Sequence, residues 1–187
     1  MAYTGKLDRD GIVREAIVLL NEGGIEAVSL RRIAERLGAS APSLARHVGD
    51  KGQLLHLLST TIFLAALDLI PEGLEGDAWL EAFGRALRTK QAETRDVLAL
   101  ISLTPPEGGQ QGERVAERLD QMMRAAGLTY ARAPLERDAI QALVTGWMTF
   151  EKSHRAGAFA ARATATDAFG DSLRALIAGF AAGRGPA

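Results

Sequence analysis

Basic side chains gather in one short stretch of this sequence, from Val28 to Lys51. Five arginines and lysines lie there against two acids, so the stretch carries a local charge of +3, although the whole chain of 187 residues carries −1. A guanidinium group matches the O6 and N7 acceptors of guanine, and both kinds of cation bind phosphate. The chemistry that this stretch offers is therefore recognition of a polyanion such as duplex DNA.

Other residue types give little support to a catalytic or metal site. The chain has no cysteine, which excludes disulfides, thiol catalysis and thiolate metal ligands. Its three histidines are scattered along the sequence, and the acids Glu93, Asp96 and Glu151 have the spacing of surface residues. No nucleophile and base accompany them. We therefore expect no enzyme activity, no cofactor and no metal.

The first half of the basic stretch predicts a short amphipathic helix. Ser29 can accept a hydrogen bond from one of the backbone N–H groups that a helix start leaves unpaired. Leu30, Ile33 and Leu37 then recur at helical spacing and form one apolar face. Gly38 supplies the left-handed residue that ends the helix.

A second short helix follows this turn. Ser40 can cap it, and Pro42 lies in its first turn, where the missing N–H costs nothing. Leu44 and Val48 are its only strongly apolar positions, so one side is buried and the rest faces outward. Two short helices joined in this way form a helix-turn-helix, whose second helix enters the major groove of DNA.

Helical periodicity extends along the rest of the chain, and no strand pattern appears. We expect Asp8 to cap a first helix that ends at Gly23, and Asp50 to cap a fourth that continues to about Ile70. The remaining sequence predicts five more helices, over residues 77–93, 95–103, 112–126, 134–157 and 165–182. A segment rich in Pro, Gly and Gln predicts a surface loop over residues 104–112.

The predicted fold class is all-α. We expect a three-helix helix-turn-helix DNA-binding domain over residues 1–52 and a larger helical effector-binding and dimerisation domain over 53–187, with about nine helices in all. The sequence has no apolar run of membrane length and no leader with a cleavage site. We expect a cytoplasmic protein.

The sequence from Leu7 to about Leu58 resembles the TetR family of one-component transcriptional regulators, and within it the tetracycline-repressor branch. The similarity lies in LDRDGIVREAIVLLNEGGIEAVSLRRIAERLGASAPSLARHVGDKGQLL, including Gly-Ile-Glu-Ala after the first helix and His-Val-x-x-Lys at the end of the motif. Further along, LEGDAW and the pair Arg95 and Asp96 still resemble that branch. The resemblance implies a homodimer that binds operator DNA and responds to a small molecule.

Carried over by position, the resemblance implies that Arg31 reaches a base edge and that Ser43, His47 and Lys51 hold phosphates. His47 could equally cap the carbonyls at its helix end. The predicted DNA-binding residues are Ser29, Arg31, Arg32, Ser40, Ala41, Pro42, Ser43, Ala45, Arg46, His47 and Lys51. The sequence departs from the family at positions 45 and 46, where aromatic residues are usual. Arg46 can replace the missing tyrosine hydroxyl, and Ala41 and Ala45 can contact thymine methyl groups.

Apolar residues of the larger domain can line an effector cavity, although for each residue taken singly ordinary core is the favoured interpretation. The candidates are Leu67, Phe83, Leu87, Leu98, Ile101, Met122, Met123, Trp147 and Phe150. Adjacent methionines and a tryptophan suit an adaptable apolar pocket. In the tetracycline branch a histidine helps to hold a magnesium–drug chelate, and Ile101 stands at that position here. We therefore expect a larger and more apolar effector without a chelate.

The last two predicted helices carry small and apolar residues that no later segment can cover. Small side chains let helices approach closely, so we expect an isologous homodimer through a four-helix bundle, as the resemblance also implies. The predicted interface residues are Ala139, Ala142, Leu143, Gly146, Phe169, Leu173, Leu176, Ile177 and Phe180.

The favoured reading is a dimeric repressor that binds a pseudo-palindromic operator and is released by its effector. Release from DNA would follow if the effector binds more tightly to a form of the dimer in which the two helix-turn-helix domains, its reading heads, lie further apart. Two alternatives stay open: an all-helical protein-interaction module that no longer binds DNA, and an all-helical enzyme in which the motif is scaffold. Replacing Lys51 and Arg31 would distinguish a regulator from an interaction module.

Overall fold

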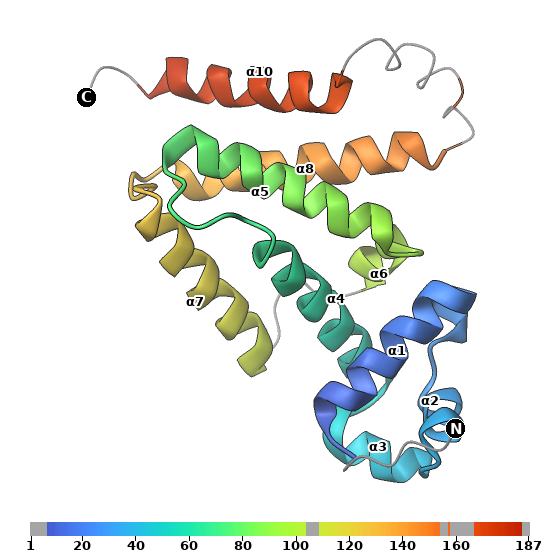
Figure 1. The fold of residues 1–187 in the computed structure, drawn as a ribbon. Coiled ribbons are helices and arrows are strands. Elements are labelled where there is room, and N and C mark those ends of the chain that lie inside the picture. The colour runs from blue at the N-terminus through green and yellow to red at the C-terminus, as the bar shows by residue number, and fades with distance from the viewer. Residues whose placement is uncertain (1–6, 104–108, 154–156, 158–166, 185–187) are drawn as a thin grey trace. The chain divides into compact units, whose positions relative to one another are not determined.

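The computed structural model describes residues 7–103, 109–153, 157 and 167–184, with side chains from 112 onward in the second of these ranges. Every regular element in the described residues is helical, which confirms the all-α prediction (Figure 1). None of these helices combines the length and hydropathy that crossing a bilayer requires. The chain divides into two compact units, one of residues 1–64 and 93–115 and the other of residues 65–92 and 116–187.

The first unit begins with three helices that pack on one another (Figure 1). Its main elements are α1 (Arg9–Gly23), the 3-10 turn η1 (Ile25–Ala27), α2 (Leu30–Leu37), α3 (Ala41–Val48), the first part of α4 (Lys51–Leu67) and α6 (Val97–Leu103). Ile12, Ile33, Leu44, Leu58 and Leu100 belong to a single buried cluster. One core thus joins all of these helices.

Four helices of the first unit begin at the capping residues that the sequence predicted. Each cap accepts a hydrogen bond from the backbone N–H three residues on: Asp8 from Gly11 at 2.7 Å, Ser29 from Arg32 at 3.2 Å, Ser40 from Ser43 at 3.3 Å and Asp50 from Gln53 at 2.8 Å. The Gln53 side chain also accepts from the Asp50 N–H at 2.9 Å, which completes a reciprocal capping box at α4.

A sharp corner at Arg95 and Asp96 attaches the start of α6 to the end of α1. The Asp96 carboxylate accepts from the Ile25 N–H at 2.9 Å, and the Arg95 guanidinium donates to the Glu22 carbonyl at 2.7 Å. Asp96 has φ 51°, a left-handed conformation that an α-helix cannot contain. For this reason α6 begins at Val97, two residues later than the sequence predicted.

The second unit is built mainly from α5 (Gly76–Glu93), α8 (Ala133–Glu151) and α10 (Ala168–Gly183), with the C-terminal part of α7 (Gly109–Ala125). Helices α8 and α10 pack on each other (Figure 1). A Cβ placed on Gly84 would lie 2.8 Å from a methyl group of Leu173 and 3.0 Å from one of Ile140. The glycine therefore lets α5 approach both helices closely.

Several helix ends differ from the expected positions. Helix α4 ends at Leu67, and a turn leads on to Ile70. Helix α7 begins at Gly109, inside the segment expected to be a loop; residues 104–108 lie outside the described part of the chain. Helix α8 ends at Glu151, short of the expected end at residue 157, and residues 154–156 are likewise not described.

An ionic cluster around the buried Glu136 holds the end of α10 in the second unit. Glu136 is 2% exposed and accepts hydrogen bonds from the Tyr130 hydroxyl at 2.5 Å and from Arg184 at 2.6 Å. Arg184 also bonds to Asp77 at 2.6 Å. Burial alone would raise the pKa of Glu136, but the hydrogen bonds from Arg184 and Tyr130 outweigh it and hold the pKa below its ordinary value. We call these four residues the Glu136 cluster.

Candidate nucleic-acid interface

The turn between α2 and α3 has the geometry that a helix-turn-helix requires. Gly38 adopts φ 64° and ψ 31°, a left-handed conformation, and its N–H bonds to the carbonyls of Ala34 and Glu35. The Ala39 N–H also reaches the Ala34 carbonyl, at 2.9 Å. These three bonds satisfy carbonyls that the end of α2 would leave unpaired. Only three residues separate the two helices, so their relative direction is fixed.

Helix α3 is held by one narrow apolar edge. Leu44 and Val48 are buried in the core of the first unit, while Pro42 and Arg46 are exposed. A helix of eight residues has no stability by itself, so the contacts of these two side chains maintain it. The remaining surface of α3 is accessible to a partner, as the sequence predicted.

The eleven predicted DNA-binding residues all lie outside the core of the first unit. Six are exposed: Arg31, Arg32, Ser40, Pro42, Arg46 and Lys51. Five are half-buried: Ser29, Ala41, Ser43, Ala45 and His47. Ser29 and Ser40 also serve as helix caps, so their hydroxyl groups are already engaged by backbone N–H groups.

Ion pairs divide the arginines of α2 into two groups. Arg36 bonds to Glu15 and Glu22 of α1, at 2.5 Å each, and its hydrogen bond to Glu22 raises its pKa. It therefore ties α2 to α1. Arg31 pairs with Glu35 at 3.1 Å, but the Arg31 side chain is 86% exposed, and such a pair contributes little. Arg31 can exchange this partner for a base or a phosphate.

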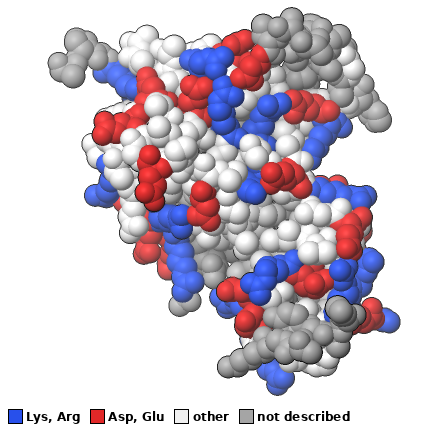
Figure 2. Space-filling view, in the orientation of Figure 1, with Lys and Arg blue, Asp and Glu red and all other residues white. Residues whose placement is uncertain are grey.

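Three cations of the motif remain available for phosphate. The side chains of Arg32, Arg46 and Lys51 make no hydrogen bond or ion pair with any other residue in the described part of the chain. Lys51 begins α4, where the helix start attracts anions. Figure 2 shows basic and acidic side chains interspersed over the visible face, in keeping with the near-neutral total.

Sequence reasoning missed one basic residue beside α3. The Arg9 Nε donates to the His47 carbonyl at 3.1 Å, which connects the start of α1 with the end of α3. This bond occupies a carbonyl that the helix end would leave unpaired. The two residues lie 38 positions apart. No local spacing rule links them, so only the folded chain brings them together.

Comparison with known proteins gives this motif a family. Residues 12–58 match the model for bacterial regulatory proteins of the tetR family. The chain is 44% identical over 54 residues to the class C tetracycline repressor of Escherichia coli, which covers 29% of this chain and 25% of the repressor. It is 31% identical over 152 residues to an HTH-type transcriptional regulator of Saccharopolyspora erythraea, over 80% of this chain and 63% of that one.

A solved structure extends the likeness to nearly the whole chain. Apo ActR from Streptomyces coelicolor matches with a TM-score of 0.73 and 28% identity, over 97% of this chain and 98% of ActR. The chain belongs to the TetR family of transcriptional regulators. ActR has also been solved in complex with actinorhodin, at 26% identity to this chain. Proteins of this family regulate transcription and are not enzymes. Helices α2 and α3 of this chain lie within the matched region and form its DNA-binding helix-turn-helix.

The candidate effector residues of this TetR-family chain fall in different surroundings. Leu67, Phe83, Leu87 and Met123 are buried, Leu98, Ile101, Met122 and Trp147 are half-buried, and Phe150 is 50% exposed. Leu98 and Ile101 belong to the first unit and the other seven to the second. Trp147 donates to Glu151 at 2.9 Å and meets Phe169 edge to face.

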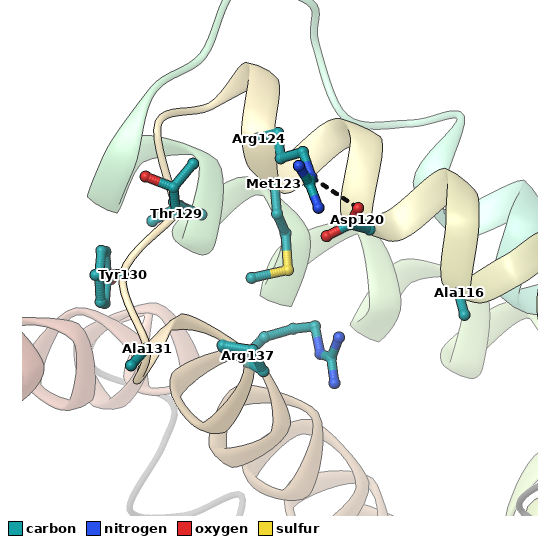
Figure 3. Close-up of a pocket in the computed structure, with 10 residues that line it drawn as sticks. Ala116, Asp120, Met123, Arg124, Thr129, Tyr130, Ala131 and Arg137 are labelled. Carbon is teal, nitrogen blue, oxygen red and sulfur yellow. Dashed lines mark hydrogen bonds and ion pairs between the residues drawn. The ribbon is translucent and has the colours of Figure 1, made fainter.

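A pocket of about 400 Å³ lies in the second unit between α7 and α8 (Figure 3). Of the nine candidate effector residues, only Met123 lines it. The rest of its lining includes charged side chains and the segment that joins α7 to α8. Apolar character in the sequence could not indicate these residues.

The predicted interface residues divide between surface and core. Ala139, Ala142, Leu143, Gly146, Leu176 and Phe180 are exposed or half-buried. Phe169, Leu173 and Ile177 are buried within the protomer, which corrects their expected surface position. Phe169 packs against Trp147 and carries the Arg88 guanidinium over its ring at 4.7 Å, and Leu173 packs beside Gly84. These three side chains hold α10 on its own protomer.

Proposed function

We propose that this chain is a dimeric repressor that binds a pseudo-palindromic DNA operator and is released by a small, largely apolar effector. The observation that carries the proposal is α3, held by Leu44 and Val48 with its opposite surface accessible. Unpaired cations lie on α2, on α3 and at the start of α4. Such a surface suits phosphates on both sides of a major groove.

Each reading head would divide its contacts between bases and backbone. Arg31 would leave Glu35 for a guanine edge, and Ala41 and Ala45 would lie against thymine methyl groups. Arg46 and Lys51 would hold phosphates. Arg9 would fix the end of α3 and add a further cation there. Two heads of a dimer would read half-sites roughly 34 to 36 Å apart.

Dimerisation would use the accessible side of α8 and α10. Ala142 and Gly146 are exposed on α8, and Ala178, Gly179 and Ala182 are exposed on α10. A row of small residues allows two helix pairs to approach closely in a four-helix bundle. In an isologous interface, each copy presents the same surface to the other.

Release from DNA would depend on an effector that binds better to the form of the dimer in which the two helix-turn-helix domains are too far apart to fit the operator. The complex of ActR with actinorhodin supports a small organic effector. Helix α4 has residues in both compact units and would transmit the change. Each tenfold difference in affinity between the two forms shifts their equilibrium by about 1.4 kcal/mol.

Substitution of the unpaired cations tests DNA binding. We expect Arg46→Ala and Lys51→Ala each to weaken binding to the DNA that flanks the chain's own gene by about tenfold. Each should also lower the slope of log affinity against log salt by about one, because each removes a phosphate contact. Fluorescence anisotropy across several salt concentrations measures both quantities.

The matched control is Arg14→Ala, which removes the same charge from an exposed position on α1. We expect a smaller loss of affinity and an unchanged slope. Absence of any preference for the flanking DNA over random duplex would overturn the proposal. If that preference is absent while the parent and both variants form dimers equally well, a protein-interaction module that does not bind DNA explains the chain better.

A further inference from the structure

The pocket in the second unit has an apolar interior and a charged edge. Met123 and Leu128 are buried side chains that line it, and Met123 points into the space between α7 and α8 (Figure 3). Its volume of about 400 Å³ is large enough for a small organic molecule. The proposed DNA-binding surface, in the first unit, contributes no residue to it.

One wall of the pocket is held rigid. Tyr130 is one of the lining residues, its hydroxyl donates to Glu136, and the Arg184 guanidinium lies 5.0 Å from the centroid of its ring. Tyr130 is thus fixed by the Glu136 cluster. A ligand that packs beside a segment fixed in this way loses little affinity to ordering the protein.

The charged edge has an excess of cations. Arg124, Arg137 and Asp120 line the pocket, and Arg124 bonds to Asp120 at 2.8 Å. Arg137 bonds to Asp138, which does not line the pocket and whose side chain is 58% exposed. Among the lining residues, Arg124 and Asp120 balance each other's charge. Arg137, whose side chain is 23% exposed, has no oppositely charged partner within the lining.

We propose that this pocket binds an amphipathic organic anion. An aromatic or alicyclic body would pack against Met123 and Leu128, and one carboxylate or sulfonate group would accept hydrogen bonds from Arg137. A planar guanidinium can bind such a group through two parallel hydrogen bonds. Asp138 is the exposed member of its pair with Arg137, and an ion pair with a solvent-exposed carboxylate contributes little, so the ligand can replace Asp138. The use of this site as a signal rests on the proposed function, whereas binding itself needs no DNA.

A pair of matched fluorescent probes tests the proposal on the full chain. Anilinonaphthalenesulfonate carries the required acid group, and phenylnaphthylamine has the same ring system without it. We expect the protein to bind the sulfonate about tenfold more tightly than the neutral probe. Arg137→Gln should remove most of this preference and leave the neutral probe unaffected.

Two further variants separate the pocket from the rest of the surface. Ala116→Trp places a large ring at an exposed position of the lining and should weaken binding of both probes. Arg118→Gln removes a charge from the same helix, where Arg118 pairs with Asp68 outside the pocket, and should weaken neither. Circular dichroism checks that each variant is folded.

Three results would overturn the proposal: equal affinity for the two probes, sulfonate binding unchanged by Arg137→Gln, or both probes unaffected by Ala116→Trp. If Arg137→Gln does not fold, raised salt takes its place, because it should weaken only the sulfonate. No DNA is present in these titrations. Their failure would therefore leave the proposed DNA binding untouched, and the reverse also holds.

Discussion

Glu136 shows how a single residue can fix the end of a helix. A buried carboxylate is tolerated only when hydrogen bonds and opposite charge replace its water, and Tyr130 and Arg184 supply both. Arg184 lies 48 residues later, just after α10. The cluster therefore attaches the end of the last helix to the start of α8.

Removing the charge of Glu136 should destabilise the second unit in a way that depends on pH. The folded-state pKa of Glu136 lies below its unfolded value, so its stabilisation is present above the unfolded pKa and is lost as pH falls through the folded one. We expect Glu136→Gln to cost about 3 kcal/mol near pH 7, because it leaves Arg184 without its buried partner. The difference from the parent should shrink below about pH 4.

Thermal unfolding followed by circular dichroism between pH 3 and pH 8 would measure this difference. Glu117→Gln, at an exposed position of α7, is the control and should change the melting temperature little. A constant gap between Glu136→Gln and the parent across the whole range would contradict the explanation.

Residue types were easier to predict from the sequence than residue partners. The sequence identified Arg31, Arg46 and Lys51 as cations of a recognition surface, because type and helical position are local properties. It did not show that Glu35 engages Arg31, that Arg9 reaches α3 or that Arg184 reaches Glu136. The last two contacts join residues far apart in the chain, which no periodicity encodes.

The helices of the first unit depend on local signals that act within a few residues. Capping hydroxyls and carboxylates bond three residues ahead, so their sequence positions set the helix starts directly. This is why the starts of α2, α3 and α4 could be predicted. The start of α6 could not, because the conformation of Asp96 is imposed by Ile25, 71 residues earlier.

The turn of the helix-turn-helix should be sensitive to a single methyl group at Gly38. A Cβ there would meet nothing within 4 Å, so the cost comes from the left-handed backbone alone. We expect Gly38→Ala to lower the free energy of unfolding by about 1 to 2 kcal/mol. Gly38→Asn should cost less, since asparagine tolerates this conformation.

Urea unfolding of the full chain would measure both values. Gly112→Ala is the matched control, because Gly112 is helical and also has open space around an added Cβ. It should stabilise the chain by about 0.5 to 1 kcal/mol. Loss of stability in Gly112→Ala equal to that in Gly38→Ala would show that backbone conformation is not the cause.

The whole molecule, in our proposal, is a pair of chains joined through α8 and α10. Gly146 and Gly179 are exposed, and a Cβ added at either would meet no other described atom within 4 Å. We expect Gly146→Glu or Gly179→Glu to raise the dimer dissociation constant at least about tenfold, because an isologous interface would bring the new charge near its own copy.

Sedimentation equilibrium would measure the dissociation constant. Gly112→Glu, on α7 and equally free of contacts, is the control and should leave the dimer intact. A parent chain that stays monomeric at tens of micromolar, or glutamate variants that dimerise like the parent, would exclude this surface.

The interface predicted from the sequence combined two surfaces of α10. Phe169, Leu173 and Ile177 face the core of the protomer, while Leu176 and Phe180 are only half-buried. Helical periodicity in the sequence shows that two sides of α10 are apolar, but it does not show what each side packs against. Which side meets its own chain depends on the packing of α5, α8 and α10, and this is a property of the fold.

The pairing of Arg31 and Arg36 with acids has a consequence for how such a molecule diverges over generations. Loss of Glu35 would leave Arg31 in place and release its positive charge on α2, whereas Arg36 would be released only if both Glu15 and Glu22 were lost. Each extra cation that reaches a phosphate displaces counterions and strengthens binding to any duplex. Tightness of binding can therefore evolve through the acidic neighbours while the side chains that distinguish one operator from another are inherited unchanged.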